Sequence, residues 1–197
     1  MSLCEVYDDK LDAKYLHELF EIVQVDLKYR ACNIANPTTW PYGMTGSHKL
    51  FGSRIFFRQN FNRIDYLDNK NSQKFFDLFD FLCNLTNRTL YLDRIDVNLQ
   101  HTGCNGTLHQ DSAPWDEQHR TMMVFPNPVW EKEWGGQFQL FDKEGNELLE
   151  EYDYVPGRII IFPSHLAHRG LGPLQEYVYR YSIVFGVRQA DPTLTNF

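Results

Sequence analysis

The chain has 197 residues, of which 43% are hydrophobic, 15% aromatic and 23% charged, a composition typical of one globular domain and not of a disordered or coiled-coil protein. Its 19 basic and 26 acidic residues give a net charge of -7, which disfavours nucleic acid as a partner because phosphate backbones attract basic surfaces. Apolar runs are far shorter than the ~20 residues of a membrane span, and the polar N-terminus does not resemble a secretory signal, so we expect a cytoplasmic protein without a membrane partner.

The first part of the chain, residues 1–88, is expected to be a helical support region. Apolar residues recur at three- and four-residue spacing over Leu11 to Val25 and over Gln73 to Leu85, which predicts two amphipathic helices that pack on a core. Between them, β-branched and aromatic residues over Phe51 to Gln59 predict a strand.

After Thr89 the pattern changes to short strands separated by Gly, Pro and Asn turn signals. The predicted strands are Leu90 to His101, Thr121 to Phe125, Gln137 to Phe141, Arg158 to Phe162 and Val178 to Val187. Asp142 to Glu147 lacks the spaced acidic ligands of a calcium loop and predicts a hairpin turn. A strand-rich core at 89–190 on supporting helices gives one domain over 1–197, of the α+β class but mainly β.

The motif with the clearest chemistry is His109-Gln110-Asp111. Residues two apart on a strand point to the same face, so this imidazole and this carboxylate can meet one ion. A further histidine, His168, follows the strand predicted at Arg158 to Phe162. Two imidazoles and one carboxylate with open positions form the facial triad that suits Fe(II) in oxygen chemistry. His109, Asp111 and His168 are therefore the candidate metal ligands.

A candidate anion site lies on the last predicted strand. Arg180, Ser182 and Val184 share one face of this strand by the same alternation. An arginine that faces the inside of the fold is costly to bury without an anion, and its planar fork matches a carboxylate. The pattern predicts a carboxylate-bearing cosubstrate near the metal.

Taken in order along the chain, these motifs resemble the Fe(II)/2-oxoglutarate dioxygenases of the prolyl 4-hydroxylase type. The resemblance covers about residues 90–187 and rests on His109-x-Asp111, Gly135 to Leu140, Phe162-Pro163-Ser164 with His168, and Arg180-x-Ser182. It implies a double-stranded β-helix, a jelly-roll or cupin-like barrel, with N-terminal supporting helices. It also implies that the His-Asp-His set binds Fe(II) and that Arg180, with Ser182, holds 2-oxoglutarate.

The implied reaction uses O2 to hydroxylate an unactivated C–H bond while 2-oxoglutarate is decarboxylated to succinate and CO2. A prolyl residue in a peptide or protein is the leading substrate that the resemblance suggests, and small molecules such as free amino acids are the alternative because fold does not fix substrate. Ascorbate is a further candidate cofactor. No oligomeric state is predicted.

The chain departs from the family pattern in the strand before the H-x-D motif. Prolyl hydroxylases usually carry a Tyr there that reaches the cosubstrate, whereas this strand reads Asp96 to His101 without a Tyr. Asn98, Gln100 and His101 are the alternatives for its place. A second histidine, His165, lies near His168, but the spacing to the Phe-Pro-Ser motif and to Arg180 favours His168 as the ligand.

Three tryptophans, Trp115, Trp130 and Trp134, lie in segments expected beside the mouth of the barrel. They are candidates for an apolar substrate wall or lid, and packing of loops onto the barrel is an equal alternative. Rival functions are a cupin-type metal-dependent dioxygenase or isomerase acting on small molecules, a zinc hydrolase and a non-catalytic metal-binding barrel module. Arg180 and Ser182 count against the first, a missing H-E-x-x-H against the second, and the complete ligand set against the third.

Overall fold

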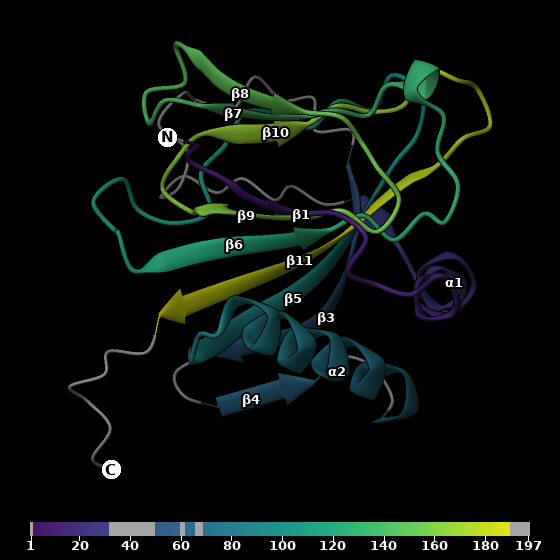
Figure 1. Ribbon diagram of the computed structural model, residues 1–197, viewed down its shortest axis with the longest axis horizontal. Helices are drawn as coiled ribbons and strands as arrows, with labels where there is room; N and C mark the ends of the chain where they lie inside the picture. Colours follow the sequence, from purple (N-terminus) through teal and green to yellow (C-terminus); the bar gives the residue numbers. More distant parts are fainter. Residues whose placement is uncertain (1, 32–49, 60–61, 66–68, 190–197) are drawn as a thin grey trace.

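The computed structural model describes residues 2–31, 50–59, 62–65 and 69–189. Two antiparallel sheets face each other, and two α-helices pack on the outer side of the larger sheet (Figure 1). The helices are α1 (Ala13–Glu21), which continues into a π-helix (Ile22–Asp26), and α2 (Asn69–Thr86). No helix in the described ranges is long and apolar enough to span a bilayer.

Among the described residues, the larger sheet has eight strands. Seven follow the order β1 (Glu5–Tyr7), β9 (Ile159–Pro163), β6 (His119–Val124), β11 (Arg180–Gln189), β5 (Leu90–Gln100), β3 (Phe51–Gln59) and β2 (Arg30–Ala31), and β4 (Asn62–Asp65) pairs with β3. The smaller sheet has the order β10 (His168–Gly170), β7 (Phe138–Phe141) and β8 (Leu148–Tyr152). A short 3-10 helix, Lys132–Trp134, precedes β7.

The strand predicted at Phe51 to Gln59, the two predicted helices and the later strands are confirmed, with ends that differ by a few residues. The hairpin turn at Asp142 to Glu147 is confirmed as well, since the amide of Asn146 donates to the Asp142 carboxylate at 2.6 Å. Five strands went unpredicted: β1, β2, β4, β8 and β10. Each has five residues or fewer, which is too short for a period-two pattern to be distinctive. Residues 1–88 therefore supply strands to the larger sheet besides the expected helices.

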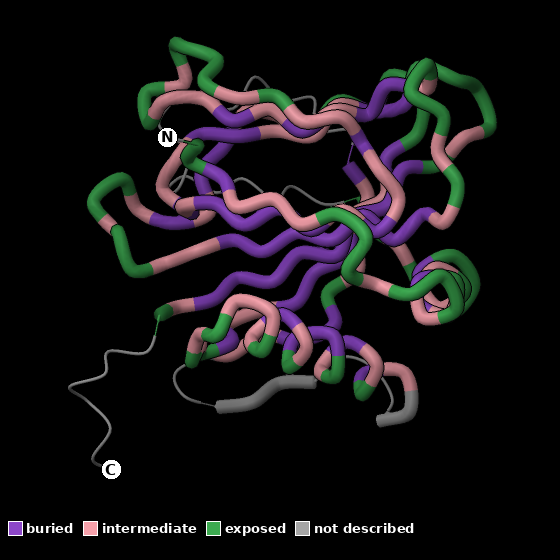
Figure 2. The backbone as a smooth tube through the Cα atoms, in the orientation of Figure 1, coloured by how far each residue is buried: buried purple, intermediate pink, exposed green. Residues whose placement is uncertain are grey.

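The central strands of the larger sheet have two different faces, as the alternation of β11 shows. Ile183 and Phe185 point outward into the core beneath α1 and α2, together with Ile95 and Val97 of β5. Val184 points inward, where it packs in a second core between the two sheets. Figure 2 shows these strands buried along most of their length. Burial on both faces explains why these strands were easy to recognise in the sequence.

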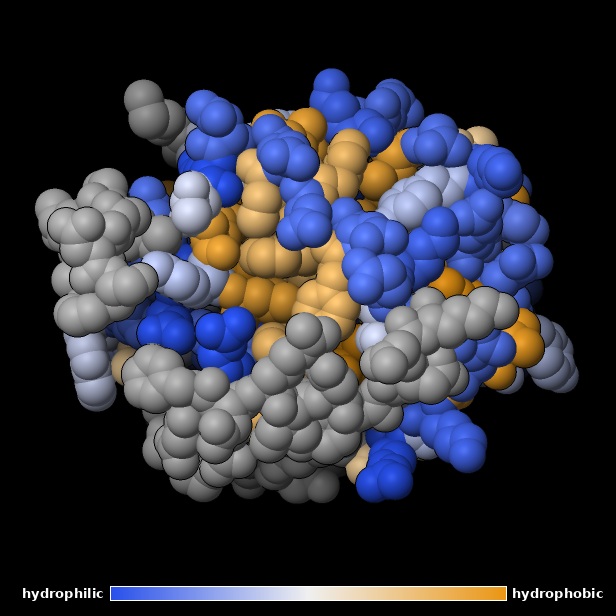
Figure 3. All heavy atoms as spheres, turned by 90° about the horizontal axis from the view of Figure 1, so that it is seen from below, coloured by the Kyte–Doolittle hydropathy of each residue, from blue (hydrophilic) through white to orange (hydrophobic). Residues whose placement is uncertain are grey.

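The face that carries α2 retains some exposed apolar surface. Figure 3 shows this side, where hydrophobic side chains gather among hydrophilic ones. A shallow groove runs between α2 and strands β3 and β5, lined in part by Phe56, Phe76, Phe79 and Leu92. These residues belong to the helix–sheet core or pack against it, so the groove is the rim of that core.

The predicted fold class is confirmed: the protein is mainly β, with antiparallel sheets in a jelly-roll arrangement and two supporting helices. Within the described residues the sheets face each other and do not join into a closed barrel. The inner core fills part of the space between the sheets with apolar side chains such as Phe125, Phe138 and Phe162. The remaining inner surface is polar, and this is where the candidate site lies.

Candidate active site

The two candidate histidine ligands are held side by side by their own backbones. The amide of His109 donates to the carbonyl of His168 at 3.1 Å, and the amide of His168 donates back at 2.8 Å. In each ring, Nδ1 lies within hydrogen-bond distance of a carbonyl, that of Thr107 at 2.7 Å and that of Leu166 at 3.0 Å. Because a carbonyl only accepts, these contacts place the proton on Nδ1 and leave both Nε2 atoms as metal-binding lone pairs.

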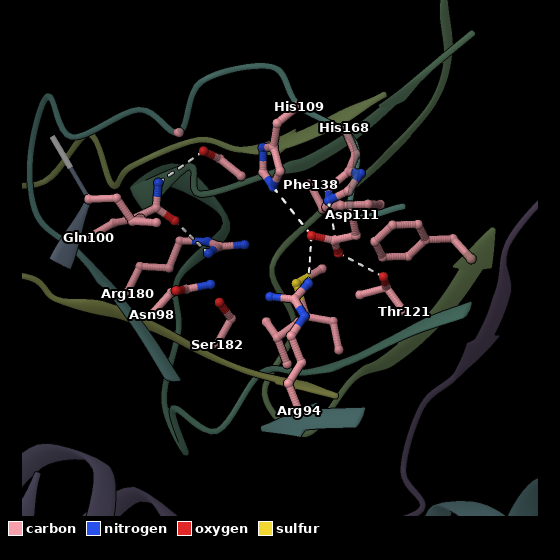
Figure 4. A pocket seen from close by; sticks show the side chains of 16 residues that line it. Arg94, Asn98, Gln100, His109, Asp111, Thr121, Phe138, His168, Arg180 and Ser182 are labelled. Carbon is pink, nitrogen blue, oxygen red and sulfur yellow. Dashed lines mark hydrogen bonds and ion pairs between the residues drawn. The ribbon is translucent and has the colours of Figure 1, made fainter. Parts of the chain in front are cut away.

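Asp111 completes the set of metal ligands. Its Oδ1 lies 3.8 Å from Nε2 of His109, and its Oδ2 lies 3.5 Å from Nε2 of His168. One ligand atom from each residue lies within 4.8 Å of the others (Figure 4). The side chains of all three are largely buried, and a His2Asp set with open positions is the donor set that Fe(II) takes in oxygenases. The residues present therefore fit a bound Fe(II).

Two neighbours fix the Asp111 carboxylate. Arg94 on β5 places Nη2 2.6 Å from Oδ1, and the Thr121 hydroxyl on β6 donates to Oδ2 at 2.7 Å. Burial alone would raise the pKa of Asp111, but the charges of Arg94 and His168 outweigh it and hold this pKa well below its usual value. Burial and the neighbouring His168 lower the pKa of His109 to about 4. At neutral pH the carboxylate is therefore ionised and His109 is neutral, as metal binding requires.

Arg180 is buried in the same pocket with only 1% of its surface exposed. Its Nε donates to the Gly136 carbonyl at 2.9 Å and its Nη1 to Oε1 of Gln100 at 2.7 Å. The remaining nitrogen, Nη2, is buried without a hydrogen-bond partner, and no carboxylate within the described ranges pairs with the guanidinium. Burial lowers the pKa of Arg180 to about 10, so the group stays charged at neutral pH. A buried cation with a free donor is a site for an anion.

The alternatives for the missing Tyr differ in their surroundings. Gln100 uses its whole amide within the protein, because Nε2 donates to the carbonyls of Cys104 at 2.7 Å and Gly170 at 2.9 Å while Oε1 accepts from Arg180. Asn98 lines the pocket opposite Ser182, and its Oδ1 is buried without a hydrogen-bond partner. His101 is exposed, and its ring contacts the carbonyl of Thr102. Of the three, Asn98 has a free polar atom inside the pocket.

The structure brings most of the candidate residues into one pocket between the sheets. The predicted residues that line it are Asn98, Gln100, His109, Asp111, His168, Arg180 and Ser182. Sequence reasoning missed Arg94 and Thr121, which also line it. The signal for Arg94 was present, since it precedes Asp96, Asn98 and Gln100 at the same two-residue interval on β5.

The three tryptophans are not among the described residues that line this pocket. Trp115 lies in the loop before β6 with 83% of its surface exposed. Trp130 packs against Tyr154 with ring centroids 4.2 Å apart, and against Trp134 at 5.5 Å. His165, the second histidine near His168, contacts the Asp116 carbonyl at 3.2 Å and lies outside the group of metal ligands.

Comparison with known proteins agrees with this geometry. Residues 97–187 match the model of the 2OG-Fe(II) oxygenase superfamily. This stretch of the chain is similar to that superfamily. The matched region contains every candidate ligand together with Arg180, and the predicted resemblance is confirmed. Sequence comparison with curated proteins gave no match.

Solved structures of the same fold are similar over nearly the whole chain. A 2OG-Fe(II) oxygenase family oxidoreductase from Burkholderia pseudomallei has a TM-score of 0.66 at 16% identity, over 96% of this chain and 86% of the other. A Trichoplax adhaerens prolyl hydroxylase, in complex with a peptide fragment of the hypoxia inducible factor oxygen degradation domain, has a TM-score of 0.63 at 15% identity, over 95% and 84%. The epimerase SnoN from nogalamycin biosynthesis has a TM-score of 0.62 at 12% identity, over 95% of this chain and 77% of the other. At such identities the likeness establishes the fold alone, and one fold can support more than one reaction.

Proposed function

We propose that the protein is an Fe(II)- and 2-oxoglutarate-dependent dioxygenase that hydroxylates an unactivated C–H bond. The observation that carries the proposal is the buried Nη2 of Arg180, which lacks a partner in the same pocket as the His109, Asp111 and His168 ligand set. A cosubstrate with a metal-chelating end and a separate carboxylate matches both features. 2-Oxoglutarate has this chemistry.

Each residue of the pocket has a role in this reaction. His109, Asp111 and His168 would hold Fe(II), and Arg180 would bind the far carboxylate of 2-oxoglutarate, with Ser182 and Asn98 beside it. When bound, Fe(II) supplies the oxidative decarboxylation of 2-oxoglutarate to succinate and CO2 and the transfer of oxygen to the C–H bond. The protein positions the reactants and excludes water, and the apolar rings of Phe138 and Phe162 line the pocket for that purpose.

A prolyl residue in a peptide or protein is the first substrate to test. The structural likeness to a peptide-bound prolyl hydroxylase supports this choice. Substrate contacts at Trp115, Trp130 and Trp134, a use for ascorbate and a cytoplasmic location stay predictions. The cupin-type small-molecule dioxygenase or isomerase and the non-catalytic metal-binding module remain the rival functions. Arg180 and Ser182 argue against the first, which does not require them, and the complete ligand set argues against the second.

The test is an anaerobic titration of the metal-free protein with Fe(II) and 2-oxoglutarate. The signal is the visible charge-transfer band of a keto acid chelated to protein-bound iron. We expect the band in the natural protein and not in Asp111→Ala, and we expect succinate to form from 2-oxoglutarate once O2 is admitted. Circular dichroism of the variant checks that its fold is intact. Bound Fe(II) without the band would refute the proposal and favour the cupin-type rival.

A further inference from the structure

A second cavity, of about 230 Å³, adjoins the metal pocket and shares Arg94 and Asp111 with it. We call it the charged basin. It is lined by Arg58, Asp93, Arg94, Asp111, His119, Ser164, Gly186 and Arg188. Apart from Ser164 and Gly186, every one of these residues has an ionisable side chain. A cavity of this size and chemistry beside the metal ligands is suited to a small polar molecule.

One wall of the basin is fixed by ion pairs. Arg188 binds Asp93 through two hydrogen bonds of 2.8 Å, from Nε and from Nη2. The ring of His119 lies between two acids, with Nε2 3.5 Å from Asp93 and Nδ1 in contact with Asp116. These ion pairs balance one another's charges and hydrogen bonds within the protein, so the residues that form them do not need a ligand.

The lining cation that is less completely paired is Arg58. Nε of Arg58 is buried and has no hydrogen-bond partner among the described residues. Arg94 crosses directly over Gly186, where a Cβ atom would lie 2.8 Å from its Cγ and 2.9 Å from its Nε. Only glycine leaves room for the arginine at this point of β11. The fold thus places a guanidinium at the boundary between the basin and the metal pocket.

The charges of the lining residues favour an anion. Arg94 and Arg188 are paired with Asp111 and Asp93, and Asp111 would also bind a metal ion, so Arg58 is the lining arginine left for a ligand. An apolar group placed here would remove Arg58 from water without replacing its hydrogen bonds, which is unfavourable. A carboxylate or a phosphate would accept a hydrogen bond from Arg58 instead.

We propose that the charged basin binds an acidic group, a carboxylate or a phosphate, of the primary substrate. The proposal rests on the proposed function and narrows its substrate class to small acids, among which a prolyl compound with a free carboxylate qualifies. The cosubstrate and the substrate would then use separate cationic sites, Arg180 for the former and Arg58 for the latter.

The test uses the full chain with Fe(II) and saturating 2-oxoglutarate under anaerobic conditions, so that Arg180 is already occupied. Calorimetry compares N-acetyl-L-proline with its uncharged amide, and phenyl phosphate serves as the phosphate probe. We expect at least one acid to bind about tenfold more tightly than the amide, a difference of about 1.4 kcal/mol. Which acid binds more tightly distinguishes a carboxylate from a phosphate.

Variants of Arg58 locate the binding. Arg58→Gln should abolish the preference for acids, Arg58→Lys should retain most of it, and neither should alter the charge-transfer band. Arg30→Gln, at an exposed arginine on β2 outside the basin, is the matched control. Equal binding of acid and amide, no binding of either acid, or an acid preference that survives Arg58→Gln would each overturn the proposal. A missing band in the natural protein would count against the proposed function instead, and the acid–amide comparison with Fe(II) alone would still test the basin.

Discussion

Two arginines, the buried Arg180 and the partly buried Arg94, lie at different places in the candidate site and differ in their partners. Arg94 on β5 bridges two carboxylates, with Nη1 2.9 Å from Asp96 and Nη2 2.6 Å from Asp111. Arg180 on β11 has only neutral partners, the Gly136 carbonyl and the Gln100 amide, and one nitrogen without any. The fold itself balances the charge of Arg94, whereas the charge of Arg180 is left for a ligand.

This difference teaches how one pocket can combine a stable fold with a free binding site. Breaking a buried ion pair destabilises a protein because the remaining charge loses its partner. Removing a buried charge that has no counterion does not have this penalty. Arg94 should therefore matter for stability, and Arg180 for affinity. Substitutions at the two positions can separate these effects.

The largest expected effect is on stability, in Arg94→Met. The substitution leaves Asp111 and the buried Asp96 without a shared cation, and we expect the free energy of unfolding to fall by about 3 kcal/mol. Asp96 keeps its pair with Arg54 at 2.8 Å, which limits the loss. Urea denaturation of the metal-free protein measures it. An unchanged midpoint would show that the Arg94 pairs do not contribute to stability.

Arg180→Met should show the opposite pattern. We expect the affinity for 2-oxoglutarate to fall about 100-fold, or about 2.7 kcal/mol, because the carboxylate loses the buried cation that has no counterion among the described residues. The urea midpoint should change far less than in Arg94→Met. Calorimetric titration of the Fe(II)-loaded protein with 2-oxoglutarate gives the affinity, and Fe(II) binding by itself is the control. A large loss of stability with unchanged affinity would reverse the assignment of the two arginines.

The sequence was sufficient to predict the parts of the fold that repeat a simple pattern. Strands β5 and β11 alternate apolar residues for the helix side with polar residues for the pocket, and α2 has a regular apolar face. The short strands β1 and β10 were missed because three residues contain no period. Their positions depend on pairing with β9 and β7, which is tertiary information.

The site was predictable to the same extent. His109, Asp111, His168 and Arg180 could be named as candidates from residue types, order and strand alternation, and the structure brings them into one pocket. The Arg94–Asp111 pair could not be, because it depends on which side chains meet across the pocket and on the room that Gly186 leaves on β11. The role of Gln100 also needed the structure, since only the hydrogen bonds show that its amide is fully used.

The pH dependence of stability tests the surroundings of His109, one of the candidate metal ligands. The folded protein holds the pKa of His109 at about 4, below the usual value near 6.5, so the unfolded chain takes up this proton first as the pH falls. Stability is therefore lost between about pH 6.5 and about pH 4, by about 2 kcal/mol between pH 7 and pH 5 for the metal-free protein. Glutamine does not titrate, so the His109→Gln variant should lose about 2 kcal/mol less stability than the natural protein between pH 7 and pH 5. The free energy of unfolding is measured by urea denaturation at each pH. If it depends on pH equally in the two proteins, the lowered pKa of His109 is contradicted.

The smallest expected effect concerns how Gln100 orients Arg180. Gln100→Ala removes the acceptor at 2.7 Å from Nη1, and we expect the half-saturating concentration of 2-oxoglutarate to rise by about fivefold to tenfold while kcat stays within twofold. Gln100→Glu should weaken the binding of 2-oxoglutarate more than Gln100→Ala does. The glutamate carboxylate would pair with Arg180 and neutralise the charge that binds the cosubstrate. Steady-state succinate formation measures both constants. Equal effects of the two substitutions would mean that Gln100 acts through packing alone, since only an electrostatic role distinguishes glutamate from alanine at this position.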